Sequence, residues 1–349
     1  MEKCLLVISC GEVLGISYEL VLKIKKLIEN NKFFIPVLIG NLTWLKFVSK
    51  KLNINFSPIV IDEKILTVTQ NLALPKNKYL LIDVLSDYHI FDFKKFSGKI
   101  SLQTLEKTVE LISLLLKLNK KFCLLTMPVS KKYIQKYEKN FVGHTEFFAK
   151  KFNVLPHQVS MLMEGMDNHK NLYRVLMLTR HIPLKDVVKN LDIEKNVFQI
   201  KNVVNFIDKY ERIKSSRIII CGVNPHNGDN GVIGDEEKTI LLKIVKKLKR
   251  LLPNKKILFP YTVADAFNFV KNKQDSLIVC SYHDQAMIAL KLLCGYKIVN
   301  ITIGLPFLRV SPGHGTAEDI MLKNIADVSG TKFCIEKLQE FLTNVNTRN

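Results

Sequence analysis

Short apolar runs alternate along the chain with longer stretches in which apolar residues recur every three or four positions. Runs of strand length occupy residues 4–9, 34–39, 79–84, 122–126, 159–163, 172–178, 218–223, 277–280 and 298–301. Helical periodicity occupies residues 18–30, 101–120 and 236–252. This alternation is typical of α/β folds, in which helices cover a sheet. We therefore predict an α/β protein, with Ser17 as a candidate N-cap of the first helix.

Length and composition set the scale of this fold. The chain has 349 residues, of which 47% are hydrophobic, so there is material for one large domain or two, each with a core. No stretch of about 18 consecutive apolar residues occurs, and we expect no membrane span. The apolar run near Met1 is too short for a signal peptide. Seven cysteines stand singly, most of them in apolar runs, which indicates reduced core residues and a cytoplasmic location.

The formal net charge of +20 raises the question of nucleic acid, which attracts basic proteins. Only 7 of the 52 basic residues are arginine, although arginine is the side chain preferred for bidentate recognition of phosphate and guanine. The lysines are dispersed in short pairs, many on the polar faces of predicted helices. We therefore expect solvated surfaces and no nucleic-acid partner. A basic binding protein without catalytic activity is the alternative from a different functional class.

Three of the eight histidines stand shortly after a strongly apolar run. They are His181, His226 and His283. Ligands gather at the carboxyl ends of strands in open α/β sheets, and three imidazoles there can hold one catalytic metal ion with a position left open for substrate. The alternative is that each histidine is an ordinary surface residue or a hydrogen-bonded cap. Their positions alone leave both interpretations open.

Distinctive short sequence motifs, called words below, surround these histidines and continue along most of the chain. They read MPVSK at residues 127–131, GHTEFF at 143–148, GVNPHNG at 222–228, YHDQ at 282–285, NITIGLPFLR at 300–309 and HGTA at 314–317. In content and order they resemble the 4-hydroxythreonine-4-phosphate dehydrogenase family of pyridoxal phosphate biosynthesis. The match runs from near residue 10 to near residue 320, so the resemblance bears on fold, activity and site residues together.

The resemblance implies a three-layer α/β/α fold with two intertwined subdomains that share a mixed sheet, like that of the isocitrate and isopropylmalate dehydrogenases. In that layout, residues 1–128 and 306–349 form the first subdomain and residues 129–305 the second. The second subdomain would carry most metal and substrate residues and the dimer interface. We expect a homodimer with its active site at the subunit interface, and His283 is the first choice for a ligand from the second chain.

The implied reaction is the oxidation of 4-phosphooxy-L-threonine by NAD or NADP, followed by decarboxylation to 3-amino-2-oxopropyl phosphate. The β-keto acid loses carbon dioxide because its ketone accepts the electrons released. His181, His226 and His283 match the family's metal ligands, and a Zn, Mg or Co ion held there would favour the substrate alkoxide. The alternative is a related dehydrogenase that acts on 4-phospho-threonate or 4-phospho-erythronate, because the words do not distinguish a substrate amine from a hydroxyl.

The same resemblance assigns substrate binding to His144, Thr145, Lys291, Asn300 and Arg309, which we expect to converge on an anion pocket beside the metal. His144 and Thr145 lie in a Gly-led loop before a predicted helix, whose N-terminal N–H groups favour an anion. The alternative is that Thr145 simply caps that helix. Arg309 follows a fixed loop that can aim its guanidinium fork at phosphate or carboxylate.

Two aspartates are candidates for catalysis. Asp284 adjoins His283, and Asp265 ends the word TVAD, so each can orient a neighbouring group or transfer a proton. An N-cap of the following helix is an equally good interpretation for both. His314 is expected to border the cofactor. No Gly-x-Gly-x-x-Gly word occurs, so a Rossmann site is not supported, and no residue is assigned to bind the cofactor.

Some words depart from the family pattern. The first family word usually reads GDPxGIGPE, whereas residues 11–19 read GEVLGISYE, so the acid is longer and both prolines are gone. Ala286 replaces a glycine after HDQ, and Gly313 stands where an aspartate is common. All assigned metal and substrate residues are retained. We therefore expect these changes to alter cofactor preference and rate more than reaction type.

Overall fold

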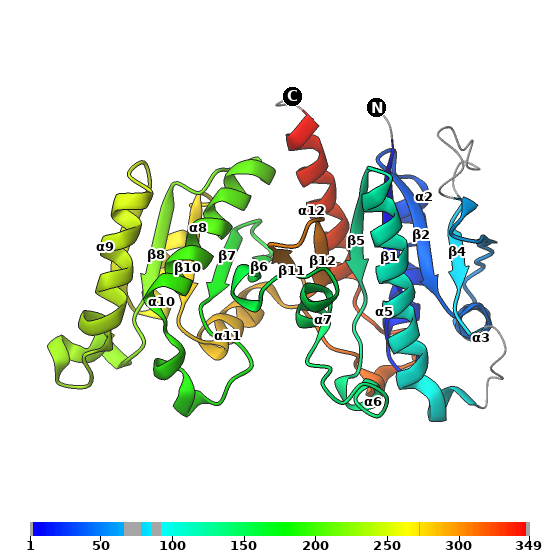
Figure 1. Ribbon diagram of the computed structural model, residues 1–349, viewed down its shortest axis with the longest axis horizontal. Coiled ribbons are helices and arrows are strands. Elements are labelled where there is room, and N and C mark those ends of the chain that lie inside the picture. The colour runs from blue at the N-terminus through cyan, green and yellow to red at the C-terminus, as the bar shows by residue number, and fades with distance from the viewer. Residues whose placement is uncertain (1–2, 66–77, 86–91, 272, 347–349) are drawn as a thin grey trace. The chain divides into compact units, whose positions relative to one another are not determined.

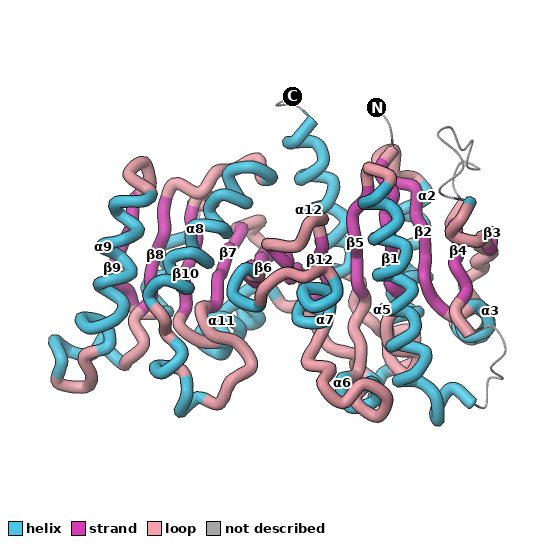
Figure 2. Tube along the Cα trace, viewed as in Figure 1, coloured by secondary structure: helices cyan, strands magenta, loops and turns pink. Residues whose placement is uncertain are grey.

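The computed structural model describes residues 3–65, 78–85, 92–271 and 273–346, which form two compact units (Figure 1). Unit 1 comprises Met1–Asn153 and Leu305–Ile335, and unit 2 comprises Val154–Gly304 and Glu336–Asn349. Each unit is thus assembled from two stretches that are separated in the sequence. The predicted mixed α/β class is confirmed, since strands and helices alternate through both units (Figure 2).

Unit 1 is built on parallel strands in the order β3-β4-β2-β1-β5-β12. Their bounds are β1 Cys4–Ser9, β2 Phe34–Gly40, β3 Ile59–Val60, β4 Leu80–Asp83, β5 Phe122–Thr126 and β12 Arg309–Pro312. β5 is buried along its whole length, as expected when both faces of a parallel sheet are covered. β1, β2, β4 and β5 confirm the strands predicted from the apolar runs. β3 has only two residues, and β12 reads RVSP, so neither forms an apolar run.

The helices of unit 1 differ from the prediction mainly where tertiary contacts decide a boundary. They are α1 Ser17–Lys23, α2 Lys25–Glu29, α3 Leu42–Lys51, α5 Phe93–Lys117, α6 Lys131–Ile134 and α7 His144–Lys151. α5 begins at Phe93 rather than near residue 101. Its added turns bury Ser97 and Gly98, and Gly98 lies so close to the Tyr133 carbonyl that a Cβ would collide with it. Small residues packed against α6, rather than apolar periodicity, extend this helix.

The predicted N-cap at Ser17 is wrong. Ser17 is the first residue of α1, whose N-cap position is Ile16 with no side-chain cap. The Ser17 hydroxyl instead donates to the Pro128 carbonyl at 2.9 Å. A long-range acceptor buried beside the helix start thus takes the hydroxyl that local sequence would have used as a cap.

Unit 2 contains mixed strands in the order β11-β6-β7-β10-β8-β9. Their bounds are β6 Ser160–Met166, β7 Leu172–Met177, β8 Arg217–Cys221, β9 Lys256–Tyr261, β10 Ser276–Cys280 and β11 Ile298–Ile303. β6 is antiparallel to both β11 and β7, whereas β7, β10, β8 and β9 pair in parallel. The carboxyl ends of these four strands therefore lie on one edge.

Helices cover the strands of unit 2, and the apolar faces of several form its core. They are α8 Ile193–Tyr210, α9 Leu242–Leu251, α10 Val263–Val270 and α11 His283–Cys294, followed by α12 Ser329–Asn346, which spans the division between the units. The stretch predicted as one helix at 236–252 begins instead with a π-helical turn, Glu237–Leu241, before α9. A single π turn of five residues is too short to show a period of its own, so sequence periodicity does not reveal it.

The division between the units assigns residues 129–153 and 336–349 differently from the predicted boundaries at 128/129 and 305/306. Phe141 and Phe148 are buried in the core of unit 1, which explains why the segment before residue 154 belongs there. Lys337, in α12, is buried among acidic residues of unit 2. Burial of these side chains, which local sequence patterns do not predict, explains both boundaries between the units.

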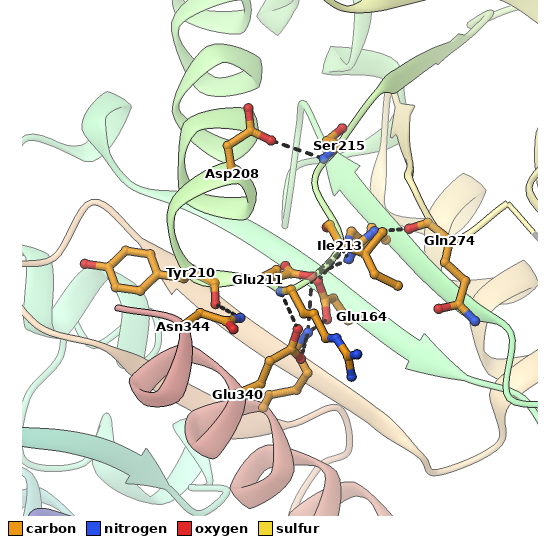
Figure 3. A network of polar contacts seen from close by, with 12 residues as sticks. Glu164, Asp208, Tyr210, Glu211, Ile213, Ser215, Gln274, Glu340 and Asn344 are labelled. Atoms are coloured by element: carbon orange, nitrogen blue, oxygen red, sulfur yellow. Dashed lines mark hydrogen bonds and ion pairs between the residues drawn. The ribbon is translucent and has the colours of Figure 1, made fainter. Parts of the chain in front are cut away.

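A buried charge network anchors the last part of the chain in unit 2 (Figure 3). Arg174 Nε donates to Glu211 Oε2 at 2.7 Å and lies 3.3 Å from Glu164 Oε1. Lys337 Nζ lies 2.8 Å from both Glu164 Oε2 and Glu340 Oε2, and 3.2 Å from Glu211 Oε2. Burial and the neighbouring Glu211 raise the pKa of Glu164 to about 8. Burial opposes ionisation of Glu211 too, but Lys337 and Arg174 outweigh it and lower its pKa to about 2.

Two further observations bear on the predicted surroundings of the protein. All seven cysteines are buried as free thiols, as their positions in apolar runs led us to expect. Within the described ranges, we find no helix with the length and hydropathy needed to span a bilayer.

Candidate active site

Three parallel neighbours of unit 2, in the order β7, β10 and β8, are each followed by one of the predicted metal histidines. The pairing of β7 and β10 continues beyond the strands, since the Thr179 N–H donates to the Ser281 carbonyl at 3.1 Å. His181 follows with a φ of 37°, which turns the backbone sharply. The apolar runs therefore deliver all three histidines to the same edge of unit 2, as predicted.

His181 and His283 lie together at this edge. Their ring centroids are 5.9 Å apart, a spacing compatible with two imidazoles on one cation, given Zn–N distances of about 2.0–2.1 Å. His283 Nδ1 is 2.7 Å from Asp284 Oδ1. A carboxylate bonded to one ring nitrogen holds the tautomer that leaves the other nitrogen able to bind a metal. The donor chemistry of this pair thus suits a divalent transition metal.

His226 is not brought into the same cluster. It is exposed in the turn after β8, and no group of three metal-binding side chains forms within the described residues. A bridge nevertheless links the neighbouring strand ends. Gln285 Oε1 accepts from the Ser281 N–H at 2.9 Å, while its Nε2 donates to the Gly222 carbonyl at 3.0 Å. The structure therefore assembles two of the three predicted ligands and ties the loop of the third to the same helix.

The N-cap interpretation of the two candidate aspartates is wrong. Asp265 lies in the first turn of α10, whose N-cap is Thr262; the Thr262 hydroxyl donates to Asp265 Oδ2 at 2.7 Å. Asp284 is the second residue of α11, whose N-cap position is Tyr282. Both carboxylates are exposed. Asp284 contacts the candidate metal ligand His283 directly. The contacts identified for Asp265 are with Thr262 and not with a candidate ligand.

Arg309 lies in unit 1, with only 2% of its surface exposed. Its Nη2 donates to Thr126 Oγ1 at 2.8 Å and its Nη1 to Thr145 Oγ1 at 3.3 Å. The guanidinium carbon stands 5.7 Å from the centroid of the Phe148 ring. Burial lowers the pKa of Arg309 to about 10. A cation buried beside neutral hydroxyls and an aromatic ring favours the approach of an anion.

His144 and Thr145 begin α7, directly beside Arg309. Thr145 is not the helix cap, since Gly143 holds the N-cap position with no side-chain bond; the Thr145 hydroxyl accepts from Arg309 instead. Burial, together with Arg309 and Lys131, holds the pKa of His144 well below its ordinary value of 6.5. His144 is therefore neutral at pH 7 and can donate one hydrogen bond without adding charge.

The other two predicted substrate residues, Lys291 and Asn300, belong to unit 2. Lys291 is exposed on α11, two turns after His283. Asn300 is half-buried in β11, and its Oδ1 accepts no hydrogen bond within the described residues. The five predicted substrate-binding residues are therefore divided between the units, since His144, Thr145 and Arg309 belong to unit 1.

Comparison with known proteins decides the family. A family model described as pyridoxal phosphate biosynthetic protein PdxA matches residues 32–337. The chain belongs to the PdxA family. A 4-hydroxythreonine-4-phosphate dehydrogenase from Sulfurihydrogenibium sp. (strain YO3AOP1) is 34% identical over 334 residues, which cover 95% of this chain and 96% of the relative. Another from Hydrogenobaculum sp. (strain Y04AAS1) is 33% identical and covers 96% and 98%.

Solved structures of proteins named 4-hydroxythreonine-4-phosphate dehydrogenase are similar to this chain over nearly all of its length. A 4-hydroxythreonine-4-phosphate dehydrogenase from Klebsiella pneumoniae has a TM-score of 0.74 at 23% identity and covers 97% of this chain and 99% of that one. One from Burkholderia phymatum has a TM-score of 0.71 at 24% identity and covers 99% of both. At these identities the likeness shows the fold. The dehydrogenase names of the curated relatives support oxidoreductase chemistry in the family.

The altered first word of this PdxA member has a definite structure. Gly11 has a φ of 68° and lies against the backbone of residues 127–128, so only glycine fits there. Glu12 is buried; its carboxylate accepts from the Leu14 N–H and the Ser101 hydroxyl, both at 3.1 Å. Burial raises the pKa of Glu12. The hydrogen bonds from Leu14 and Ser101 thus accommodate Glu12 inside unit 1, where the family pattern has the shorter aspartate.

Sequence reasoning missed several residues that position the site. Thr126 holds Arg309, and it is the polar residue that closes the apolar run of β5. Gln285 bridges two strand ends from within the word YHDQ. Glu237 is buried under the His226 loop. The feature that could have pointed to it is an acidic residue near the start of the predicted amphipathic helix. In each case the residue was visible in the sequence, but local patterns did not show which groups it would bond.

Proposed function

We propose that this PdxA member oxidises 4-phosphooxy-L-threonine with NAD or NADP in the presence of a divalent metal. Decarboxylation of the resulting β-keto acid then gives 3-amino-2-oxopropyl phosphate for pyridoxal phosphate biosynthesis. The observation that carries the proposal is the combination of a family match over residues 32–337 with a buried arginine beside two hydroxyls. The substrate offers both a phosphate and a carboxylate, and such a guanidinium recognises either.

The residues of unit 1 supply anion recognition. Arg309 donates from its planar fork, and Thr126 and Thr145 fix the plane of that fork. His144 is neutral because burial lowers its pKa. It can therefore donate a hydrogen bond to the anion without adding a positive charge. In the proposed reaction, Lys291 and Asn300 make further contacts with the substrate from unit 2. Fixed donors of this kind cost little reorganisation when the substrate binds.

The histidines of unit 2 supply the proposed metal ligands. His181, His226 and His283 would hold the cation, and Asp284 keeps His283 in its metal-binding tautomer through the Nδ1 bond. When bound, a divalent ion supplies Lewis acidity toward the hydroxyl that is oxidised. Asp284 and Asp265 are the proposed proton acceptors, and both carboxylates are exposed to solvent. No residue is assigned to the nicotinamide cofactor.

We further propose that the working unit is a homodimer whose metal sites are completed across the interface. α11, which begins with His283, presents large apolar side chains to solvent. Ile288 is 61% exposed, Leu292 82% and the following Tyr296 62%. These residues are spaced four apart, as on one side of a helix, and exposed large apolar side chains on one side favour a protein interface. A partner that contacts them would lie near the candidate ligand His283.

Turnover of 4-phosphooxy-L-threonine tests the proposed function. The chelated protein is assayed with NAD and with NADP, before and after Zn²⁺, Mg²⁺ or Co²⁺ is restored, and both reduced cofactor and carbon dioxide are measured. We expect activity only with metal. The variants H181A, H226A and H283A should each lose activity and bind metal more weakly. His169 is exposed, so H169A is the matched control. Absence of turnover with every cofactor and metal would contradict the proposal.

Subunit exchange tests the dimer. If His283 and Arg309 serve one site from different chains, a mixture of H283A and R309A variants regains one intact site per mixed dimer, and activity returns. Sedimentation of L292E measures the interface directly, since a charge on the exposed face of α11 should shift the protein toward monomer. Full activity of a monomer at nanomolar concentration would exclude the shared site.

A further inference from the structure

The loop that carries His226 has an unusual backbone. From His226 to Gly231 every residue has a positive φ, with values between 41° and 102°. This is a left-handed turn, which residues other than glycine disfavour because Cβ crowds the following carbonyl oxygen. His226 itself has a φ of 51°. Such a backbone persists only where its surroundings determine it, so a neighbouring group must hold this turn in place.

Glu237 is that group. The residue is 5% exposed, and its carboxylate lies under the loop. Oε1 accepts from the backbone N–H groups of Val223 and Asn224, both at 2.8 Å, and Oε2 accepts from Asn224 Nδ2 at 3.0 Å. These bonds take the backbone away from the sheet at the end of β8, where the apolar run alone predicted two more strand residues.

The turn packs against this carboxylate. A Cβ on Gly228 would lie 2.4 Å from the Gly234 carbonyl oxygen and 2.7 Å from Glu237 Oε2. A Cβ on Gly222 would lie 2.4 Å from Asn227 Oδ1 and 3.0 Å from Glu237 Oε1. Neither position therefore has room for a larger side chain. Glu237 is itself the first residue of the π-helical turn Glu237–Leu241. A π turn widens the helix locally and is frequent at functional sites, and here it places the carboxylate beneath the loop.

We infer that Glu237 is a positioning residue for His226: its buried carboxylate holds the left-handed turn and thereby sets the imidazole for metal binding. The inference rests on the proposed function, because it takes His226 as a metal ligand. A buried carboxyl group is unfavourable unless it is fully hydrogen-bonded. The acceptors of Glu237 are satisfied by the loop backbone and by the side chain of Asn224, so its contacts serve the loop that carries the ligand.

Cobalt binding by the metal-free full-length protein tests this inference. Co²⁺ is titrated into wild type, E237A, E237Q and G228A, and affinity is read from the ligand-field absorbance. Loss of a residue that orients a metal ligand typically weakens metal affinity about 10–100-fold. We expect a loss in that range for E237A and G228A, which disturb the turn from opposite sides. E237Q keeps one acceptor oxygen but points an amide at Asn224, and its loss should be smaller.

Two controls separate positioning from general damage. Asp235 is exposed and its side chain makes no hydrogen bond that we identify, so D235N removes the same charge nearby and should bind cobalt within about twofold of wild type. Hydrogen exchange of the Val223 and Asn224 amides should accelerate in E237A while the thermal transition stays close to that of wild type. If E237A does not fold, E237Q and G228A carry the same expectation in the same order.

The outcomes are distinguishable from failure of the proposed function. H226A serves as the reference for loss of one ligand. If H226A binds cobalt weakly while E237A and E237Q bind like wild type, the positioning role of Glu237 is overturned and the metal assignment stands. If H226A itself binds cobalt like wild type, the metal assignment falls and the inference falls with it.

Discussion

Each unit buries an arginine, and the two guanidinium groups differ in the acceptors that hold them. Arg174 in unit 2 is 1% exposed and lies against the carboxylates of Glu211 and Glu164. Arg309 in unit 1 is 2% exposed, and the acceptors identified for it are the hydroxyls of Thr126 and Thr145. Burial opposes ionisation of both, but the carboxylates of Glu211 and Glu164 outweigh it and raise the pKa of Arg174, whereas the pKa of Arg309 is lowered to about 10.

The difference teaches how a buried charge reveals its role. A guanidinium that is neutralised by carboxylates within its own unit is part of the fold, because removal of either partner leaves an uncompensated charge. Arg309 keeps a lowered pKa despite the charge of Glu146, so we expect an anionic ligand to relieve part of its desolvation cost on binding. The first arrangement should therefore govern stability and the second should govern substrate affinity, and substitutions can separate them.

The largest effect is expected for R174M. This change leaves Glu211 and Glu164 buried without their arginine, and breaking such a pair typically costs about 3–5 kcal/mol of unfolding free energy. Urea unfolding of wild type and variant measures the loss. Substrate affinity of the folded fraction should stay unchanged. A variant of wild-type stability would mean that the network contributes nothing to the fold.

R309M should give the reverse result. Loss of a charge-assisted hydrogen bond costs about 1.5–3 kcal/mol, so the affinity for 4-phosphooxy-L-threonine should fall about 10–150-fold. Unfolding free energy should fall little, because the variant also removes a desolvated charge. R309K, which keeps the charge without the planar fork, is the matched control and should lie between the two. Normal turnover by R309M would exclude Arg309 from the site.

A pH series sharpens the account of the network around Arg174. The pKa of Glu164 rises from 4.5 to about 8 on folding, so its contribution to stability is complete below 4.5 and is lost as pH rises to about 8. E164Q cannot ionise. We expect E164Q to gain stability relative to wild type as pH rises through this window, as measured by urea unfolding at successive pH values. Parallel curves for the two proteins would contradict the raised pKa.

The smallest effect concerns His144 beside Arg309. Its pKa is held below 6.5 by burial first and by the two cations second. R309M removes one cation, so the pKa of His144 should rise yet stay below 6.5, because the ring remains buried. NMR titration of the His144 ring measures this shift. K131M removes the exposed cation and should give a smaller rise, since solvent screens its charge.

The sequence by itself determined most of the strands and the placement of the three histidines at their ends. Apolar runs rich in β-branched residues, such as 218–221, favour a buried strand, and the first polar residues after them leave the sheet. That reasoning placed His181, His226 and His283 on one edge of unit 2, and the motif words identified the family.

Only the tertiary structure decided which partner each polar group takes. Ser17 donates to the carbonyl of Pro128, Thr126 holds Arg309, and Glu237 accepts from the backbone of Asn224. The physical reason is range. Periodicity and capping rules describe interactions over a few residues, whereas a buried hydrogen bond joins any two segments that the fold brings together. Packing across a hundred residues therefore settles which partners each buried arginine contacts.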